Sequence, residues 1–534
     1  MTAAMSTRLV LLFFMIVAVV IAWPLLLNMD SLIIDTHDGL LITWIMNWNI
    51  HSFTTGIGGL INLYSANIFY PYQNTLAYSD LHLPLSLLAL PWVIVTGQPL
   101  VAYNTSLFLG FVLTGWSLFI LLRLLTGKNK LSILLSALFT FSTLHLNYSA
   151  HPQLFNFWPI ILATLFLFQK RFRLFILFFL VSALTTALYF YFLLVLVTIY
   201  LWSFPTSRKQ VLISTLLAVI ITTPFLFPYN LVSRQFDYVR PMTDAIHFSL
   251  QFPDLLNISQ ASRLSTFIPP TSAGTPAYFG AVFSLLLLFT IYQLIKKRVF
   301  LGEAKQRFFK FSIVLALVSF VMALGPALHI FPDTVRVGPL AALPLPYAFF
   351  YYTVPGFAGL RTPSRWILLT AFALVLVLGI LSRSKLSWRW VMLLISLVIV
   401  EINFPFSYHR VPKVEEFPPE QLWLRDNFLG APIIQFPIYN WDNKEFGQET
   451  LREYYSTIHW HRMFNGYSGF SPPEWERRVK WLQKSFPSKD SLSYLRSLKI
   501  ELILAPREWR GELFSYDELR LVKGFERTDV FELL

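Results

Sequence analysis

Long apolar runs separated by short polar segments make up most of residues 1–404. A membrane-spanning helix needs about 20 mostly apolar residues, and the pattern predicts about eleven such helices. They are expected at residues 9–28, 100–122, 131–147, 156–169, 174–187, 188–204, 210–228, 278–295, 311–331, 366–382 and 390–404. No small-residue cleavage motif follows the first run, so we interpret it as a retained helix and not as a signal peptide. The pattern therefore predicts a polytopic α-helical membrane protein.

One apolar segment, Leu81–Thr96, does not fit this scheme because Pro84 and Pro91 interrupt it. If it crossed the membrane, the next group of basic residues would lie outside, against the positive-inside rule. We therefore predict that it is re-entrant or lies at the outer interface, where irregular backbone is tolerated when protein covers it.

The pattern changes after residue 404. Short proline-started helices are expected in "PPEQLWLRDNFL" and "PPEWERRVKWLQKSF", and a buried strand in "APIIQFPI". The segment "SLSYLRSLKIELILAP" is expected to pass from helix to strand, and "ELRLVKGFERTDVFELL" to form two alternating strands. This predicts a soluble α/β domain at residues 405–534, which is long enough for a core of its own.

Composition and charge fix the orientation. The chain is 55% hydrophobic and 13% charged, with a net charge of +13, whereas soluble domains are about a quarter charged. The basic excess lies between the apolar runs, so the positive-inside rule predicts a cytoplasmic N-terminus and an extracytoplasmic C-terminal domain. The tail is nearly neutral, with 18 Lys and Arg against 19 Asp and Glu, and this excludes a nucleic-acid-binding surface.

The predicted outer loops are residues 28–99, 147–159, 229–277 and 332–365, and they hold most of the acids that precede the tail. In the first loop, "IIDTHDGLLITWIMNW" places Asp35 and Asp38 just beyond the first helix. Either acid could cap the helix expected at residues 39–51. Either could instead serve as a general base or a metal ligand, with Asp38 the candidate ligand for a divalent cation such as Mg²⁺ or Mn²⁺.

Arginine in an outer loop runs against the positive-inside rule. "GLRTPSRW" holds Arg361 and Arg365 in one turn before an apolar helix. The planar guanidinium suits phosphate, and a helix start favours anions. We predict a lipid-phosphate site here; the alternative for an outer arginine is a local salt bridge.

Other polar side chains in the outer regions are candidates for substrate binding. A lone histidine in an aromatic loop is usually structural, and "HWHRMFNGYSGF" could be a structural loop or a sugar-binding loop that stacks a ring on Trp460 or Tyr467. The candidates are His151, Gln153, Asp80, His82, His459 and Tyr467.

Several segments carry a family resemblance. They are "DGLLITWIMNW", "NIFYPYQNTLAYSDLHL", "AYNTSLFLGFVLTGW", "SAHPQLFNFWP", "PLPYAFFYYTVPGFAGLRTPSRW" and "STIHWHRMFNGYSGFSPPEW". Together they resemble a bacterial branch of the GT-C superfamily of membrane glycosyltransferases. The resemblance implies a GT-C-like fold and transfer of a sugar from a polyprenyl-phosphate donor at the outer face of the plasma membrane, the bacterial inner membrane. The acceptor could be a glycan, a lipid or a protein.

The resemblance also implies a role for the first outer loop. An acid just past the first helix acts in the superfamily as catalytic base or metal ligand, and Asp38 matches that position best, followed by Asp35. The second outer loop often carries another acid, whereas this chain has His151 and Gln153 there. The alternative function is a non-catalytic protein that binds or transports lipid-linked glycans. A transporter would be expected to show internal repeats and mid-membrane ionisable residues. The sequence shows neither pattern, which favours the enzyme.

Overall fold

A computed structural model describes residues 7–270, 275–296, 301–330, 333–335, 338, 342–382, 386–403 and 407–534. The chain forms two compact units. The first, here called the helical unit, comprises Met1–Pro24, Leu107–Pro224 and Val239–Phe406. The second, here called the sheet unit, comprises Leu25–Ser106, Phe225–Tyr238 and Ser407–Leu534.

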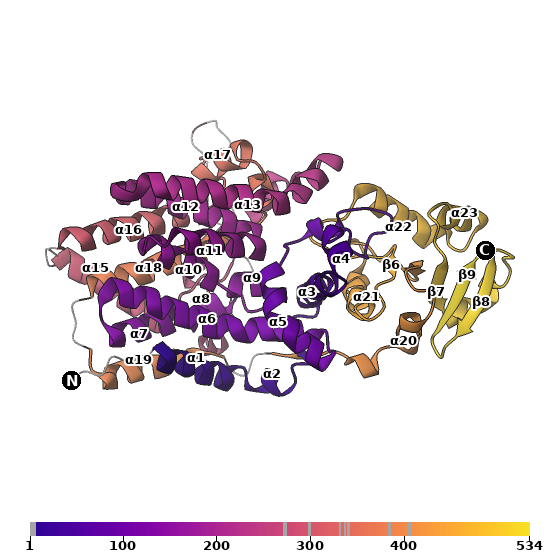
Figure 1. The fold of residues 1–534 in the computed structure, drawn as a ribbon, viewed down its shortest axis with the longest axis horizontal. Helices are drawn as coiled ribbons and strands as arrows, with labels where there is room; N and C mark the ends of the chain where they lie inside the picture. Colours follow the sequence, from indigo (N-terminus) through magenta and orange to yellow (C-terminus); the bar gives the residue numbers. More distant parts are fainter. Residues whose placement is uncertain are drawn as a thin grey trace. The chain divides into compact units, whose positions relative to one another are not determined.

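The helical unit is built from antiparallel and crossing helices (Figure 1). Its helices are α1 (Thr7–Ile21), α7 (Asn129–Thr140), α8 (Thr143–Leu146), α9 (Pro152–Phe155), α10 (Trp158–Phe168), α11 (Phe172–Thr185), α12 (Ala187–Ser203), α14 (Met242–His247), α15 (Ala281–Lys296), α16 (Glu303–Ala323), α17 (Pro346–Thr353), α18 (Ile367–Leu381) and α19 (Trp388–Glu401). A short hairpin joins β2 (His329–Ile330) to β3 (Asp333–Thr334). The units share α2 (Trp23–Leu27), α6 (Leu100–Thr126) and α13 (Arg208–Gln235). Helix α18 is apolar on every side and buried almost throughout, which makes it the central helix of this unit.

In the part of the chain that the structure describes, four helices are long and apolar enough to cross a membrane, judged by length and composition. They are Leu100–Thr126, Pro205–Gln235, Glu303–Ala323 and Pro363–Leu381. Shorter apolar helices accompany them, so the chain is a multi-pass membrane protein. The count of eleven spans remains a prediction, and the predicted span ends at residues 331 and 404 lie outside the described residues.

The sheet unit combines the first outer loop with the C-terminal residues. The loop forms β1 (Leu32–Ile33), α3 (Asp38–Thr54), α4 (Ile57–Ile61) and α5 (Leu83–Thr96). The C-terminal residues form β4 (His409–Arg410), α20 (Pro419–Asp426), β5 (Pro432–Gln435), α21 (Gln448–Ser456), β6 (Arg462–Met463), α22 (Pro473–Ser485), α23 (Lys489–Ser497), β7 (Leu502–Pro506), α24 (Arg510–Leu513), β8 (Leu519–Gly524) and β9 (Thr528–Leu533).

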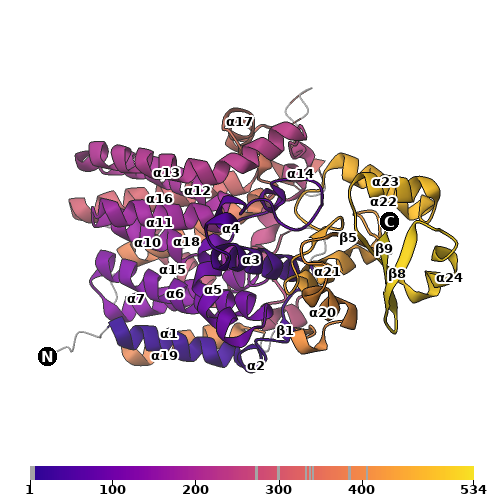
Figure 2. The same cartoon turned by 45° about the vertical axis from the view of Figure 1, so that its right-hand side comes forward.

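A five-stranded mixed sheet organises the C-terminal residues, in the order β6-β5-β7-β9-β8. Strand β5 runs parallel to β6 and β7, while β9 is antiparallel to β7 and β8. Figure 2 shows strands of this sheet together with helices α22 to α24. The strands expected from the sequence contain β5, β7, β8 and β9, because short apolar or alternating runs bounded by turn residues favour strands.

Backbone hydrogen bonds hold the first outer loop to the tail. Strand β1 pairs with β4 in antiparallel fashion. Beside β6, the amide of Met463 donates to the carbonyl of Asn67 at 2.7 Å and the amide of Phe69 donates to the carbonyl of Asn465 at 3.0 Å. A shared apolar core, which includes Leu40 of α3 and Tyr454 of α21, lies behind these pairs. The sequence assigned these segments to separate domains, 1–404 and 405–534, and that boundary lies outside the described residues.

Helix α5 is the proline-broken segment that did not fit the predicted topology. Its 14 residues span roughly 21 Å, short of the hydrocarbon thickness of about 30 Å. One side packs on α3 through the buried Leu85 and Ala89. The opposite side exposes apolar side chains, including Trp92 and Val95. A helix that packs on protein with one side and exposes apolar side chains on the other suits a position against lipid, and the interfacial assignment remains a prediction.

Candidate active site

Asp38 is the first residue of α3, and the turn before it is fixed by Asp35. The amide of His37, the N-cap residue, donates to Oδ1 of Asp35 at 2.8 Å. Asp35 therefore stabilises the turn before the helix, which is a structural role other than the helix cap considered for it. Within the described residues no side-chain hydrogen bond caps α3, so the carboxylate of Asp38 stands at the positive end of the helix without serving as its cap.

The side chain of Asp38 meets the C-terminal residues at Tyr467. The hydroxyl of Tyr467 donates to Oδ1 of Asp38 at 3.3 Å. Burial raises the pKa of Tyr467, and the negative charge of Asp38 raises it further. The phenol therefore stays protonated at neutral pH and remains a donor to the carboxylate.

Beneath Tyr467 lies a buried acid. The amide of Tyr467 donates to Oε1 of Glu453 at 2.5 Å. The side chain of Glu453 is fully buried, and its Oε2 has no hydrogen-bond partner in the described part of the chain. Burial raises the pKa of Glu453 well above its ordinary value, and the nearby Glu449 raises it further. Both effects favour the neutral form of the Glu453 side chain, whose Oε1 holds the Tyr467 backbone.

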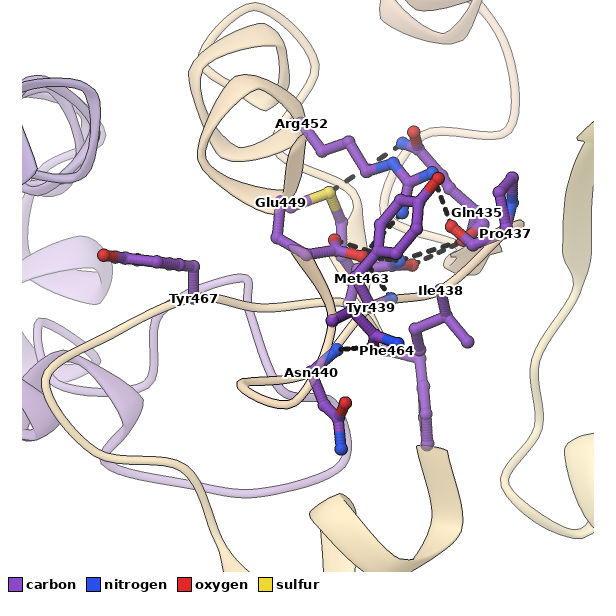
Figure 3. A network of polar contacts seen from close by, with 12 residues as sticks. Gln435, Pro437, Ile438, Tyr439, Asn440, Glu449, Arg452, Met463, Phe464 and Tyr467 are labelled. Carbon is purple, nitrogen blue, oxygen red and sulfur yellow. Dashed lines mark hydrogen bonds and ion pairs between the residues drawn. The ribbon is translucent and has the colours of Figure 1, made fainter. Parts of the chain in front are cut away.

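Glu449 anchors a second part of the same network (Figure 3). It accepts the amide of Tyr439 at 3.0 Å, the guanidinium of Arg452 at 2.6 Å and the side-chain amide of Asn465 at 3.1 Å. Figure 3 shows the side chain of Tyr467 pointing away from this network. One helix, α21, thus fixes the loop that presents Tyr467.

The same helix also contacts the turn that carries the acids. The hydroxyl of Thr450 donates to the carbonyl of Thr36 at 3.2 Å. Just before α21, Gly447 lies against the exposed ring of His37, because a Cβ at Gly447 would stand 2.6 Å from Nε2 of His37. The tail therefore contacts the two residues that precede Asp38 in the turn.

Two predicted binding residues lie in the interior instead. His82 is fully buried at the N-cap of α5. His459 is buried in the tail, where its Nε2 lies 3.1 Å from Oε1 of Gln421 and its Nδ1 accepts the amide of His461 at 3.1 Å. Burial lowers the pKa of His459 well below its ordinary value. Both histidines are enclosed by protein, and a binding role for either stays a prediction.

Asp80 and Trp460, two further candidates from the sequence, lie in different surroundings. Asp80 is half-buried next to Ser79, whose carbonyl accepts the hydroxyl of Tyr229 at 2.9 Å. The ring of Trp460 stacks on His51, with the ring centres 4.6 Å apart. Trp460 therefore packs against α3, whereas Tyr467 reaches the acid.

The predicted phosphate residues belong to the helical unit. Arg361 is exposed, and its guanidinium carbon lies 4.9 Å from the ring centre of Phe248. Arg365 lies in the 3₁₀ turn Pro363–Trp366 that leads into α18. Burial raises the pKa of Tyr148 to about 12, and the positive charge of Arg365 opposes that rise. The charge of Arg365 is therefore near enough to Tyr148, in the second outer loop, to affect its pKa.

Contacts within the helical unit bring the second, third and fourth outer loops together. The amide of Ser364 donates to the carbonyl of Phe248 at 3.2 Å, and the side-chain amide of Asn147 donates to the carbonyl of Pro276 at 3.5 Å. His151 is the N-cap of α9. Gln153 is buried, and its Oε1 lacks a hydrogen-bond partner among the residues described. The outer loops that contact one another in the helical unit thus hold Arg361 and Arg365 together with His151 and Gln153.

Whether the described residues can hold a divalent cation depends on which of their side chains could act as ligands. Within the described ranges no three His, Asp or Glu side chains come together as metal ligands. Mg²⁺ can be held by one or two carboxylates with substrate phosphates. Here one oxygen of Asp35 already accepts the His37 amide. The residues present do not build a protein-held metal site, and no reaction step is derived through a metal.

Sequence reasoning missed the supporting residues of α21. Glu449, Thr450 and Glu453 occur in a polar stretch, "QETLREYYS", that is typical of a solvated helix. Their i, i+4 spacing places Glu449 and Glu453 on one helix face. That spacing was the available signal, although acids on one face more often point to water.

No protein-family model matches the sequence, and no curated protein matches it. Among solved structures, the arabinofuranosyltransferase AftD from Mycobacteria is 13% identical with a TM-score of 0.59; the alignment covers 99% of this chain and 40% of AftD. The chain has a GT-C fold.

Two further structures align with lower TM-scores. The oligosaccharyltransferase AglB from Archaeoglobus fulgidus is 11% identical (TM-score 0.46; 94% of this chain, 70% of AglB). ArnT from Cupriavidus metallidurans bound to undecaprenyl phosphate is 10% identical (TM-score 0.40; 98% of this chain, 97% of ArnT). At these identities the likeness concerns the GT-C fold, and this chain spans less than half the length of AftD.

Proposed function

We propose that this chain is an inverting membrane glycosyltransferase. It transfers a sugar from a polyprenyl-phosphate donor to an acceptor at the outer face of the plasma membrane, the bacterial inner membrane. The observation that carries the proposal is the placement of Asp38. This acid begins α3 and accepts a hydrogen bond from Tyr467, within a chain of GT-C fold.

The reaction follows from a positioned carboxylate. Asp38 takes the proton from an acceptor hydroxyl while that oxygen attacks the anomeric carbon of the donor sugar. The new carbon–oxygen bond forms as the bond from the anomeric carbon to the phosphate oxygen breaks. The prenyl phosphate leaves with the electron pair. A single displacement of this kind inverts the configuration at the anomeric carbon.

The surroundings of Asp38 support a base near the membrane surface. Helix α3 packs on α5, whose exposed side carries Trp92 and Val95. Apolar side chains of that kind favour the lipid interface. A prenyl chain stays in the hydrocarbon, so its phosphate and sugar reach no deeper than the headgroups. A base on the neighbouring helix is suited to act at that depth.

The donor phosphate is assigned to the arginines of the helical unit. Arg361 and Arg365 offer planar forks that suit a phosphate monoester. The proposed topology has about eleven spans, a cytoplasmic N-terminus and the C-terminal domain outside. The name of AftD, a transferase of arabinofuranosyl groups, adds support for glycosyl transfer as the reaction class.

The test is donor turnover by the full-length protein in nanodiscs. Synthetic prenyl-phosphate sugars are supplied with envelope glycans as acceptor, and the release of free prenyl phosphate is measured. We expect Asp38→Asn to lower the rate by roughly 10²–10⁴-fold, the usual contribution of general acid–base groups. Asp35→Asn is the matched control, because asparagine can still accept the His37 amide.

Two results would contradict the proposal. Full activity of Asp38→Asn would remove this acid as the base. A wild-type protein that binds the donor but consumes none would favour the alternative, a non-catalytic protein that binds or transports lipid-linked glycans.

A further inference from the structure

An exposed indole lies in the same residue cluster as Asp38. Trp441 follows β5, and 49% of its surface is exposed. Its ring lies 5.2 Å from the ring of Tyr467 and 4.3 Å from the ring of Phe446, measured between centres. Phe446 and Tyr467 are themselves buried and lie 4.7 Å apart. The indole is therefore backed by two buried rings and remains open to solvent.

The turn that carries Trp441 is rigidly held. The side-chain oxygen of Asn443 accepts the amide of Asn440 at 2.8 Å and the side-chain amide of Gln483 at 2.8 Å. Gln483 also donates to the carbonyl of Ile438 at 2.8 Å. A preordered aromatic side chain loses little conformational entropy when it binds a ligand. The exposure of Trp441 is thus not the result of a loose loop.

The groups around the indole are polar. Asp442 is exposed and pairs with Lys480 at 2.6 Å, and Lys444 and Glu445 are exposed as well. A lipid or an apolar peptide would need a contiguous apolar patch. A sugar ring instead presents one face of C–H bonds and a rim of hydroxyls. That combination matches an aromatic face surrounded by carboxylate, amide and ammonium groups.

We infer that Trp441 forms a subsite for a sugar ring of the acceptor, so that the acceptor is a glycan of at least two residues. This inference rests on the proposed function, because it assumes that Asp38 deprotonates the acceptor. Tyr467 links the two positions, since it contacts Asp38 through its hydroxyl at 3.3 Å and Trp441 through its ring at 5.2 Å. With the length of the tyrosine side chain added, the indole centre lies no more than roughly 11 Å from the carboxylate.

That upper limit bears on which sugar is bound. A span of up to roughly 11 Å accommodates about two sugar residues, so we take the stacked ring to be the neighbour of the ring whose hydroxyl reacts. The donor in the proposed reaction carries a single sugar on its phosphate. The second ring therefore belongs to the acceptor. Among glycan, lipid and protein acceptors, this selects a glycan.

The test measures sugar binding without turnover. Neutral trisaccharides of glucose, mannose, galactose and arabinose are added one at a time to the full-length protein in nanodiscs, and saturation-transfer NMR reports binding. We expect at least one to bind the wild type, and Trp441→Ala to weaken that binding by about tenfold, the scale of one aromatic contact. Trp441→Phe should retain part of the affinity. Phe514→Ala is the control, because this aromatic residue is similarly exposed, at 55%, and packs on Phe531 in β9.

The outcomes separate this inference from the proposed function. Absence of binding by every trisaccharide, or equal binding by Trp441→Ala and the wild type, would overturn the subsite. Asp38→Asn should bind the trisaccharide like the wild type and transfer sugar roughly 10²–10⁴-fold more slowly. If Asp38→Asn stays active while Trp441→Ala loses binding, the proposed base is wrong and the glycan subsite stands. Thermal midpoints matching the wild type verify that each variant is folded.

Discussion

Replacement of Glu453 by glutamine examines the buried acid that holds Tyr467. The carboxyl is fully buried and its pKa is raised well above the ordinary value of 4.5. Glutamine has the same shape, stays neutral at every pH and can still accept the Tyr467 amide, which lies 2.5 Å from Oε1. The variant therefore removes the proton equilibrium and keeps the contact.

The sign follows from proton linkage. Between the ordinary pKa and the raised one, Glu453 is ionised in the unfolded chain and protonated in the folded chain. The unfolded state then binds fewer protons, so stability falls as the pH rises. Each pH unit inside this window changes the folding equilibrium tenfold, or about 1.4 kcal/mol. Glu453→Gln should abolish this part of the pH dependence.

The assay is thermal unfolding of the purified protein, followed by tryptophan fluorescence at pH 5, 6 and 7. Relative to the wild type, the midpoint of Glu453→Gln should rise by several degrees at pH 7 and by much less at pH 5. Glu445→Gln is the matched control, because Glu445 is exposed in the turn before α21. An identical difference between Glu453→Gln and wild type at all three pH values would refute the buried neutral acid.

Three further predictions concern the site and the topology. Tyr467→Phe removes the hydroxyl that lies 3.3 Å from Asp38 and should slow transfer by about tenfold, a typical loss for a hydrogen bond to a charged group. In the Asp38→Asn background the same change should cost nothing more, and additive losses would contradict a coupling between Tyr467 and Asp38. Arg361→Lys and Arg365→Lys, measured by prenyl-phosphate binding, should reveal one arginine whose planar fork is required; unchanged binding in the Arg361→Ala, Arg365→Ala double variant would exclude the site. In this cysteine-free chain, an impermeant thiol reagent applied to intact cells should label Glu526→Cys and spare Lys209→Cys; labelling of Lys209→Cys would mean that the predicted topology is wrong.

The amino-acid pattern alone predicted long apolar helices and four strands of the tail, β5, β7, β8 and β9. Helix α18 could be predicted because every side of it is apolar, and such a segment is stable only inside a bundle or in lipid. Strands β5 and β7 could be predicted because each is a short apolar run between turn residues. The position of Asp38 at the start of α3 also follows from local sequence, since an acid favours the first turn of a helix.

Tertiary structure decided what surrounds that acid. Tyr467 stands 429 residues from Asp38 along the chain, and no local pattern specifies such a pairing. Glu453 resembles a solvated acid in sequence, yet it is buried because α21 packs on α3 of the first outer loop. Periodicity determines which side of a helix or strand is apolar, whereas long-range packing decides which other element covers that side. Burial, and with it the protonation of Glu453 and the exposure of Trp441, depends on that second choice.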